Sequence, residues 1–479
     1  MPNDYKIIRD PIHNYIHVPV ELCELFVDTP IFQRLRNIEQ TSMRPLYPSA
    51  HHDRFSHSLG VYYLADMAFR FLKKNTEEAI LEELQISNYY YPFVIAALMH
   101  DCGHAPFSHL FEEYYNKGQY CTTLLYSVVG EPFKDDYQKN LDEGHKPGAH
   151  EIFSAAILLK HYRESLLKLV PENKLDLIAR MITGNIHTFT GNDSEKDLEN
   201  CLITLINGSA IDVDKLDYIL RDTWASGVNN VTIDVRRLLS ALLIAKSRTG
   251  RLVVAFKKSA LSVIQSVVDG RNFLHKYIYG HHIVVYYSHI LENAFKETKR
   301  KFGDGDEFID ALFTERVFQE PVPINNSCFY LPTDGDLFYV MKKYYNEINE
   351  VKEFLGRKPN FLPLWKTRAE FEIVFSEADR IKARYRNNVK AHAFDILQDI
   401  INDESEVKVI DVKPKVKQIE DGDILIWFKE NEIIQYNDQR VNRATMSGLP
   451  DGAGETPYFI IYVHERYRDR LSDCIEKVR

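Results

Sequence analysis

The chain has 479 residues, of which 45% are hydrophobic and 27% are charged. This composition is typical of an ordinary globular protein and excludes a fibrous or largely disordered one. The 69 acidic residues outnumber the 59 basic ones and give a formal charge of -10, which disfavours a protein that coats nucleic acid.

The six cysteines are scattered and form no CxxC pair, which argues against a disulfide framework and against a thiolate zinc site. The N-terminus lacks the apolar segment of a signal peptide. No apolar run approaches the roughly 18 to 20 residues that a membrane span needs. We therefore expect a cytoplasmic protein without membrane contact.

In chain order, the hydropathy pattern changes three times. Residues 5–18 alternate loosely around a proline, which predicts a short N-terminal hairpin. Apolar residues then recur at spacings of three and four up to about residue 400, as in 61–72 and 152–159, which predicts a mainly helical body with one strand at 251–256. The tail has short segments rich in strand formers, at 407–412, 424–428 and 458–463, and a closing helix at 467–477. We therefore expect a mainly α protein with a core over residues 1–300 and a smaller helical and α+β lobe over 301–479.

The segment most informative about chemistry runs from Ala96 to His109. An apolar helix leads into His100, Asp101 and His104, and such groups are costly to bury unless they have partners. His100 and His104 are four residues apart and are expected to share a helix face, with Asp101 beside them. A cluster of metal ligands explains this pattern, whereas a lone histidine here would more simply be a core residue.

Other elements offer further ligands. His57 lies at the start of the apolar stripe 61–72, and Asp214 shares one predicted helix face with Tyr218 and Asp222. A set of two imidazoles and two carboxylates without a thiolate suits magnesium, manganese, iron or zinc, with coordination positions left for water or substrate. We therefore expect one divalent ion in a catalytic site. Taken singly, His57 or Asp214 could equally be a capping or solvated residue.

The set His57, His100-Asp101 and Asp214 resembles the H…HD…D signature of HD-domain metal-dependent phosphohydrolases. The surrounding sequence is similar to that of one branch of this superfamily, the deoxynucleoside triphosphate triphosphohydrolases related to the vertebrate SAM-and-HD-domain enzyme. The similarity rests on six ordered motifs, DPIH (10–13), DTPIFQRLR (28–36), RFSHSLGV (54–61), HDCGHAPFSH (100–109), IDVDKLDY (211–218) and RD (221–222). It covers roughly residues 5–290, without a preceding SAM domain.

The resemblance implies an HD-domain helical core and the hydrolysis of dNTPs to a deoxynucleoside and inorganic triphosphate. His57, His100, Asp101 and Asp214 would hold the metal, and a further magnesium ion could accompany the substrate. The family's positions for proton transfer at the scissile bond fall on His104, Glu112 and His150. An imidazole can protonate the leaving 5′ oxygen and a carboxylate can orient it.

The same resemblance assigns substrate contacts. Arg54, Lys215 and Arg271 would hold the phosphates, with Tyr218 as a hydroxyl donor. Gln40 and Asp222 would read the deoxyribose, and Tyr279 would pack on the sugar. Two departures weaken the substrate assignment. The loop 41–53 lacks the glycine-rich run of the relatives, and Gly280-His281-His282 replaces a Gln-His-Lys. The long polar segment 116–148 is expected to form a lid or an insertion.

An allosteric nucleotide site is a further implication, because Lys6, Asp28, Gln33 and Arg36 match activator-binding positions. The alternative is that residues 28–36 are only a helix N-cap and its first turn. By resemblance we expect a homo-oligomer, either a dimer or a tetramer, with a nucleotide activator.

Two alternatives stay open. One keeps the metal site but hydrolyses another phosphate ester of a nucleotide or a nucleic acid. The other is a nucleotide-sensing or nucleic-acid-binding regulator with a degenerate site. The complete ligand set argues against the regulator, and the acidic charge disfavours tight nucleic-acid binding without excluding it.

Overall fold

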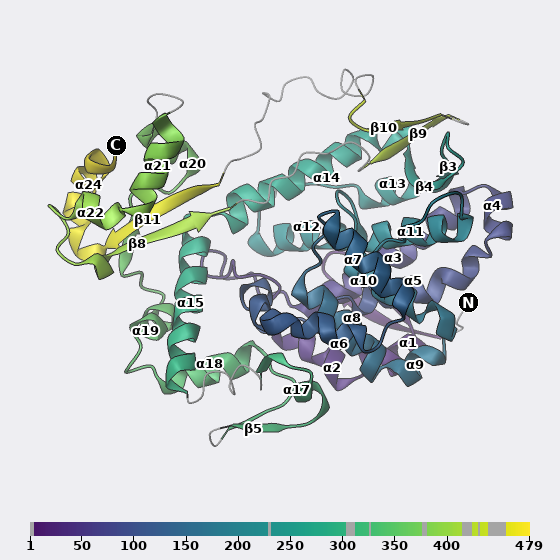
Figure 1. Ribbon diagram of the computed structural model, residues 1–479, viewed down its shortest axis with the longest axis horizontal. Coiled ribbons are helices and arrows are strands. Elements are labelled where there is room, and N and C mark those ends of the chain that lie inside the picture. The colour runs from purple at the N-terminus through teal and green to yellow at the C-terminus, as the bar shows by residue number, and fades with distance from the viewer. Residues whose placement is uncertain are drawn as a thin grey trace.

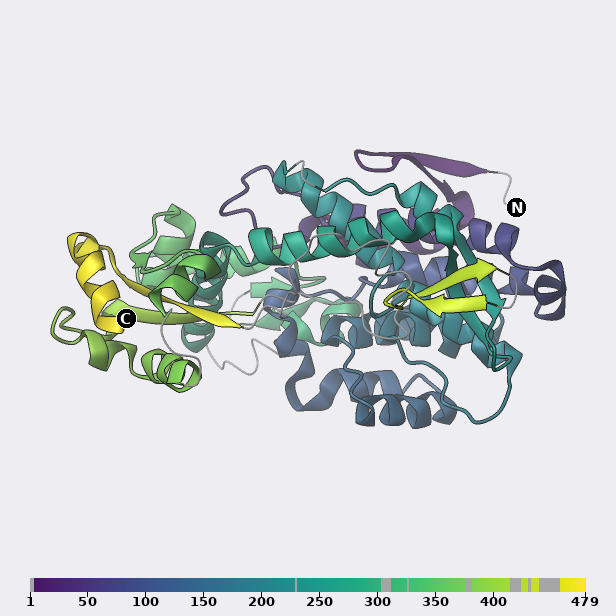
Figure 2. The same cartoon turned by 90° about the horizontal axis from the view of Figure 1, so that it is seen from above.

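The computed structural model describes residues 4–228, 231–302, 312–324, 327–375, 381–413, 424–429, 432–438 and 457–479. The protein is mainly α, as the hydropathy pattern predicts. A helical core occupies one end of the molecule and a smaller C-terminal lobe of helices and strands occupies the other (Figure 1). Seen from above, the N-terminus lies at the end of the core that is remote from this lobe (Figure 2).

The predicted N-terminal hairpin is confirmed. Strands β1 (Tyr5–Asp10) and β2 (Asn14–Pro19) pair antiparallel, and Asn14 takes a left-handed conformation at the turn with φ 64°. Ile16 and Val18 are fully buried, so one face of the hairpin packs on the core. Four short helical segments follow, α1 (Val20–Leu22), η1 (Cys23–Val27), α2 (Pro30–Gln33) and η2 (Arg34–Asn37).

The core is built around α3 (Arg54–Asn75), which contacts α5 (Tyr90–Met99) and α12 (Val213–Ser226). The apolar stripe predicted within 61–72 is buried, because it faces these two helices. None of the helices in the described ranges combines the length and the hydropathy that a membrane crossing requires. The remaining helical elements of the core are α4 (Glu78–Glu83), η3 (Ile86–Tyr89), η4 (Ser108–Leu110), η5 (Glu112–Gln119), α6 (Tyr120–Tyr126), α7 (Glu131–Asp142), α8 (Ala149–His161), α9 (Arg163–Leu167), η6 (Glu172–Lys174), α10 (Leu175–Thr183), α11 (Ser194–Ile206), α13 (Val235–Ser240), η7 (Lys258–Ala260), α14 (Leu261–Phe273), η8 (Leu274–Tyr279) and α15 (His282–Lys301).

A four-stranded sheet beside α11 and α13 joins distant parts of the chain. Its order is β10 (Glu432–Gln435), β9 (Leu425–Lys429), β4 (Leu252–Lys257) and β3 (Leu242–Lys246). β4 confirms the strand predicted after the turn, and β9 confirms a predicted tail strand. However, β9 pairs in parallel with β4 of the core as well as antiparallel with β10, whereas the tail strands predicted at 407–412 and 458–463 belong to another sheet. The division into residues 1–300 and 301–479 therefore stays a prediction, and this strand pairing crosses it.

The C-terminal lobe contains a three-stranded sheet of order β7 (Phe361–Pro363), β11 (Tyr458–His464) and β8 (Val407–Val412). Trp365 is buried beside it and donates its indole N–H to the carbonyl of Phe459 over 2.6 Å. The other elements after α15 are α17 (Arg316–Gln319), β5 (Val322–Ile324), β6 (Ser327–Phe329), α18 (Asp334–Lys343), α19 (Asn349–Gly356), α20 (Arg368–Val374), α21 (Ile381–Ala391), α22 (Ala393–Leu397), η9 (Glu404–Glu406), η10 (Glu465–Arg470) and α24 (Leu471–Val478). The predicted closing helix corresponds to η10 and α24.

Candidate metal centre and active site

His57 lies in the first turn of α3, as predicted. Asp53 caps this helix by accepting the backbone N–H of Ser56 over 2.8 Å, which fixes where α3 begins. The imidazole of His57 is fully buried, and its Nδ1 donates to Oδ2 of Asp217 over 2.8 Å. The opposite nitrogen, Nε2, is therefore turned away from Asp217 and is available as a ligand.

His100 and Asp101 lie directly after α5, which ends at Met99. Nδ1 of His100 donates to the carbonyl of Ala97 over 2.9 Å. Asp101 is buried and accepts a hydrogen bond from Arg54 over 2.7 Å. Burial alone would raise the pKa of Asp101, but the positive charge of Arg54 outweighs it and holds that pKa well below its usual range.

The prediction that His100 and His104 share a helix face is wrong. The helix has ended before either residue, and His104 lies in the turn that follows. Gly103 makes this turn by close approach to α8, because a Cβ there would lie 2.8 Å from the ring of Phe153. The helix cannot resume in the next residues because Pro106 has no backbone N–H.

Asp214 lies in the first turn of α12, whose N-cap is Asp212. Its Oδ1 lies 3.0 Å from Nε2 of His57 and 3.7 Å from Nε2 of His100. The two imidazoles hold the pKa of Asp214 below its usual value even though burial acts in the opposite direction. For His57, burial would lower the pKa, but Asp214 and Asp217 raise it to about 9.

The four predicted ligands therefore converge. Nε2 of His57, Nε2 of His100 and an oxygen of Asp214 lie within 4.8 Å of one another. Oδ2 of Asp101 is 3.8 Å from the first of these nitrogens and 3.5 Å from the second. Both Nε2 atoms are buried without a hydrogen-bond partner among the described residues, which is costly unless another group contacts them. A set of two imidazoles and two carboxylates with orphaned nitrogens fits a divalent cation.

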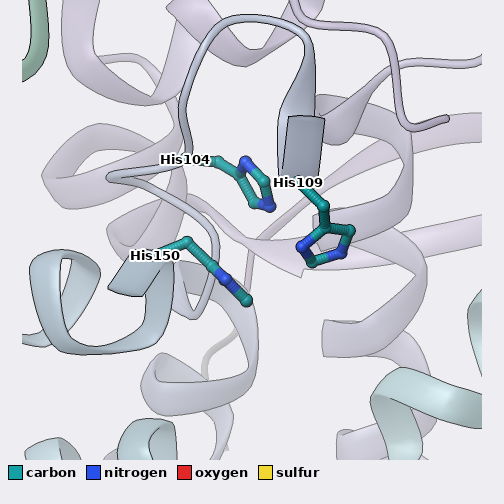
Figure 3. Close-up of side chains that lie close together, drawn as sticks. All are labelled: His104, His109 and His150. Atoms are coloured by element: carbon teal, nitrogen blue, oxygen red, sulfur yellow. The ribbon is translucent and has the colours of Figure 1, made fainter. Parts of the chain in front are cut away.

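A second cluster contains three histidines. The side chains of His104, His109 and His150 point toward one another from the turn after α5, from η4 and from α8 (Figure 3). Glu112 links two of them, because its carboxylate accepts Nδ1–H of His150 over 2.7 Å and Nδ1–H of His109 over 2.9 Å. Gly148 makes room for this contact, since a Cβ there would lie 2.8 Å from Oε1 of Glu112.

The side chains of this cluster have pKa values that are shifted in different directions. Burial lowers the pKa of His150, but the charge of Glu112 outweighs it and raises that pKa to about 9. In turn, His150 and His109 hold the pKa of Glu112 well below its usual value, against the effect of burial. His104 is fully buried, neither of its ring nitrogens has a described partner, and burial together with the charge of Arg54 holds its pKa well below the usual value. At neutral pH the cluster thus holds a protonated His150 beside a neutral His104.

The three cations predicted to hold the phosphates differ in the hydrogen-bond partners that they have within the protein. Arg54 is buried and donates to Asp101, to Oγ of Ser108 and to the carbonyl of Gln40. Lys215 is held by Asp212 and by the carbonyl of Gly208. Nε of Arg271 is buried without a described partner. Burial raises the pKa of Tyr218 to about 12, and the charges of Arg271 and Lys215 oppose that rise, which places these groups together.

The residues predicted to read the sugar also lie in contact. The hydroxyl of Tyr279 donates to Oδ2 of Asp222, and Nε2 of His52 donates to Oδ1 over 2.6 Å. Gln40 is 5% exposed, and its side-chain oxygen has no partner among the described residues. The structure thus brings Tyr279 and Asp222 together. The side-chain oxygen of Gln40 remains a buried acceptor in the segment whose backbone pairs with that of His52.

The four candidate activator-binding residues form two pairs at the surface. Lys6 on β1 makes an ion pair with Asp28. Arg36 donates to the side-chain oxygen of Gln33 over 2.8 Å. Asp28 does not cap α2, whose N-cap is Thr29. The alternative reading of residues 28–36 as a helix start is correct for the backbone, while a binding role for these four residues stays a prediction.

The segment 116–148 forms helices α6 and α7 beside α8 and α10. A buried ion pair between Arg180 and Asp136, at 2.8 Å, fastens α7 to α10. Asn140 adds a hydrogen bond of 2.7 Å to Asn185. The segment is therefore packed against the core, and its assignment as a lid or an insertion stays a prediction.

Comparison with known proteins agrees with this geometry. Residues 54–207, which carry His57, His100-Asp101 and the second cluster, match the family model described as HD domain. This segment of the chain is therefore similar to an HD domain. Asp214 follows the matched segment by seven residues, and its Oδ1 lies 3.0 Å from Nε2 of His57.

Several curated proteins are similar to this chain. The deoxynucleoside triphosphate triphosphohydrolase SAMHD1 of Gallus gallus is 30% identical over 290 residues, which are 58% of this chain and 43% of the relative. The human protein of the same name is 25% identical over 423 residues, 83% of this chain and 62% of the relative. The uncharacterized protein YwfO of Bacillus subtilis is 26% identical over 310 residues, 64% of this chain and 59% of the relative. The chain spans about half the length of the curated relatives it matches.

Among solved structures, a hypothetical protein from Aquifex aeolicus superposes with a TM-score of 0.61 at 20% identity. The match covers 99% of this chain and 100% of the other. At this identity the similarity supports the fold alone.

Sequence reasoning does not identify three residues around the candidate site. One is His109, although its spacing of three from Glu112 indicates the contact. His13 and Asp217 meet at 2.6 Å across 204 residues of chain, and no local pattern signals that pairing.

Proposed function

We propose that this protein is a metal-dependent hydrolase of deoxynucleoside triphosphates that releases a deoxynucleoside and inorganic triphosphate. The observation that carries the proposal is the convergence of His57, His100, Asp101 and Asp214 beside the cluster of Glu112, His150 and His104. The similarity to dNTP triphosphohydrolases supports the choice of substrate.

The ion can be magnesium, manganese, iron or zinc, all of which accept nitrogen and oxygen ligands. When bound, it would act as a Lewis acid on a phosphate oxygen. The protein's own contribution is to hold each imidazole in one orientation, since Asp217 and the carbonyl of Ala97 occupy both Nδ1 atoms.

His150 supplies the proton in this proposal. Its raised pKa of about 9 means that the ring is protonated at neutral pH. Glu112 binds Nδ1, so Nε2 is left to donate to the leaving 5′ oxygen. His109 shares the same carboxylate, and we add it to His104, Glu112 and His150 as a member of the proton-transfer group.

Arg271, Lys215, Arg54 and Tyr218 would bind the triphosphate. Of the three cations, Arg271 has a buried donor without a partner among the described residues and is therefore the strongest candidate. Gln40 would accept a hydrogen bond from a hydroxyl of the sugar, and the contact between Tyr279 and Asp222 would leave no room for a 2′-hydroxyl, so these residues would select the deoxyribose.

A product-resolved assay tests the function. The purified chain is incubated with manganese and with each dNTP, ribonucleotide and mononucleotide, and the phosphorus products are separated. Triphosphate from dNTPs supports the proposal. Pyrophosphate or monophosphate would favour another phosphate ester as substrate, and no product with any nucleotide would favour the regulator.

We also propose a homo-oligomer, either a dimer or a tetramer, controlled by a nucleotide that binds at Lys6, Asp28, Gln33 and Arg36. The two surface pairs provide cations for phosphate and an amide and carboxylate for a base. Light scattering with and without GTP would show whether assembly depends on nucleotide. An unchanged mass and unchanged turnover would contradict this control.

A further inference from the structure

We propose that Asp334, which begins helix α18 in the C-terminal half of the chain, is a positioning residue for the active site. It would hold the loop 104–108, which carries His104 and leads to His109 and Glu112, against the backbone next to Gln40. This inference rests on the proposed function for its catalytic consequence.

The contacts of Asp334 join two segments that are distant in the chain. Oδ1 accepts the backbone N–H of Phe107 over 2.6 Å, and Oδ2 accepts the backbone N–H of Glu39 over 2.9 Å. The residue is 6% exposed. One carboxylate thus fixes the spacing between the loop that carries His104 and the residue that precedes Gln40.

The loop needs such an external tie because its backbone is unusual. Phe107 and Ser108 are successive non-glycine residues in the left-handed region, with φ 57° and 54°. This conformation persists only where surrounding contacts determine it. Oγ of Ser108 donates to the carbonyl of Glu39 and accepts from Nε of Arg54, so the two segments are also joined to the ligand-bearing helix α3.

A second tie runs through Arg34 to the same stretch of the C-terminal half. The guanidinium of Arg34, which is 4% exposed, donates to the carbonyl of Pro332 over 2.8 Å and to the carbonyl of His104 over 2.5 Å. The ring of Phe338 in α18 packs edge-on against Phe107 with centroids 4.8 Å apart. Residues 332–338 therefore contact Phe107 directly and are linked to His104 through Arg34.

Asp334 is not needed to begin its own helix. The start of α18 is a capping box in which Thr333 and Asp336 satisfy each other, with Asp336 accepting from both N–H and Oγ1 of Thr333. Both oxygens of Asp334 instead leave the helix for the loops. Burial raises the pKa of Asp334 to about 7, although the hydrogen bonds from two backbone N–H groups act to lower that pKa. Keeping the charged carboxylate in this buried position therefore costs free energy.

The test compares Asp334→Ala and Asp334→Asn with a matched control, Asp336→Ala, which removes the capping box two residues away. Hydrogen exchange is followed by mass spectrometry in peptides that cover residues 36–41 and 104–110, and turnover and metal content are measured on the same samples. For Asp334→Ala we expect exchange at Glu39 and Phe107 to accelerate by about tenfold or more. We expect kcat to fall by about tenfold, with KM within roughly threefold and metal content unchanged.

Asp334→Asn keeps one acceptor oxygen, so we expect its changes in exchange and in kcat to lie between those of the unaltered chain and of Asp334→Ala. If the alanine variant does not fold, the asparagine variant tests the positioning role. Asp336→Ala should keep both exchange and turnover near those of the unaltered chain. Unchanged exchange in Asp334→Ala, or an equal loss of turnover in Asp336→Ala, would overturn the positioning role. If the unaltered chain hydrolyses no dNTP, the proposed function fails, whereas the exchange experiment still decides the role of Asp334.

Discussion

Oδ2 of Asp217 accepts a hydrogen bond from Nδ1 of His57 over 2.8 Å in a part of the core where both side chains are fully buried. Asp217 also binds Arg221 on the same helix, at 2.8 Å, and His13 from the segment after β1. Gly60 provides the space, because a Cβ there would lie 1.9 Å from Oδ1 of Asp217. The orientation of the candidate ligand His57 on α3 therefore depends on a carboxylate of α12.

Replacing Asp217 by asparagine should weaken metal binding although Asp217 is not itself a ligand. An amide removes one of the two acceptor oxygens and leaves Arg221 with Asp10 as its remaining carboxylate partner, so we expect the free energy of unfolding to fall by about 3 kcal/mol. Loss of the partner of His57 should reduce metal affinity by roughly 10 to 100-fold. Calorimetric titration with manganese and denaturant unfolding measure the two effects. Asp395→Asn, at the exposed pair with His392, is the control and should change both quantities little.

Replacing His100 and Asp101 together by alanine should abolish metal binding and lower turnover by about 100-fold or more. Helical content should persist in the circular dichroism spectrum, because α5 ends at Met99. Metal content is measured by mass spectrometry of the purified variant. The exposed pair His392 and Asp395, 3.1 Å apart, provides a control double variant that should retain the metal. Undiminished turnover without His100 and Asp101 would disprove the assigned metal centre.

The pH profile of the enzyme should report His150. A general acid works in its protonated form, and the pKa of this ring is raised to about 9, so kcat/KM should be steady near neutral pH and fall as the pH rises through about 9. Glu112→Gln removes the charge that opposes burial, so the pKa of His150 should drop and the fall should move to lower pH. The exposed neighbour Glu113, replaced by glutamine, should leave the profile unchanged. An identical profile for Glu112→Gln would exclude His150 as the acid.

Arg271→Ala should weaken substrate binding more than it affects the ion. Its buried Nε has no described partner, and a charge-assisted hydrogen bond contributes about 1.5 to 3 kcal/mol, so KM should rise by roughly 10 to 100-fold. Metal content should stay the same, because Arg271 is not among the clustered ligands. Arg300, whose side chain is 73% exposed on α15, serves as the control cation. A parallel loss of metal would place Arg271 at the metal centre instead.

The amino-acid sequence determined the parts of the site that depend on local pattern and on motif. Three parts of the site follow from short-range spacing, because a helix repeats every 3.6 residues. They are the helix that begins near His57, the apolar run that leads into His100-Asp101 and the helix face of Asp214. The hairpin at 5–18 and the strands of the tail could be predicted for the same reason, since strand residues alternate with a period of two.

Only the tertiary structure decided which of these elements meet. The hairpin of tail strands β9 and β10 joins β4 of the core, Asp217 meets His57 across 160 residues, and Asp334 meets Phe107 across 227. These contacts form where burial removes water from polar groups, which must then find partners wherever the packed chain supplies them. A local spacing rule carries no information about such partners, so the residues that form the cluster of candidate ligands could be predicted and the groups that orient them could not.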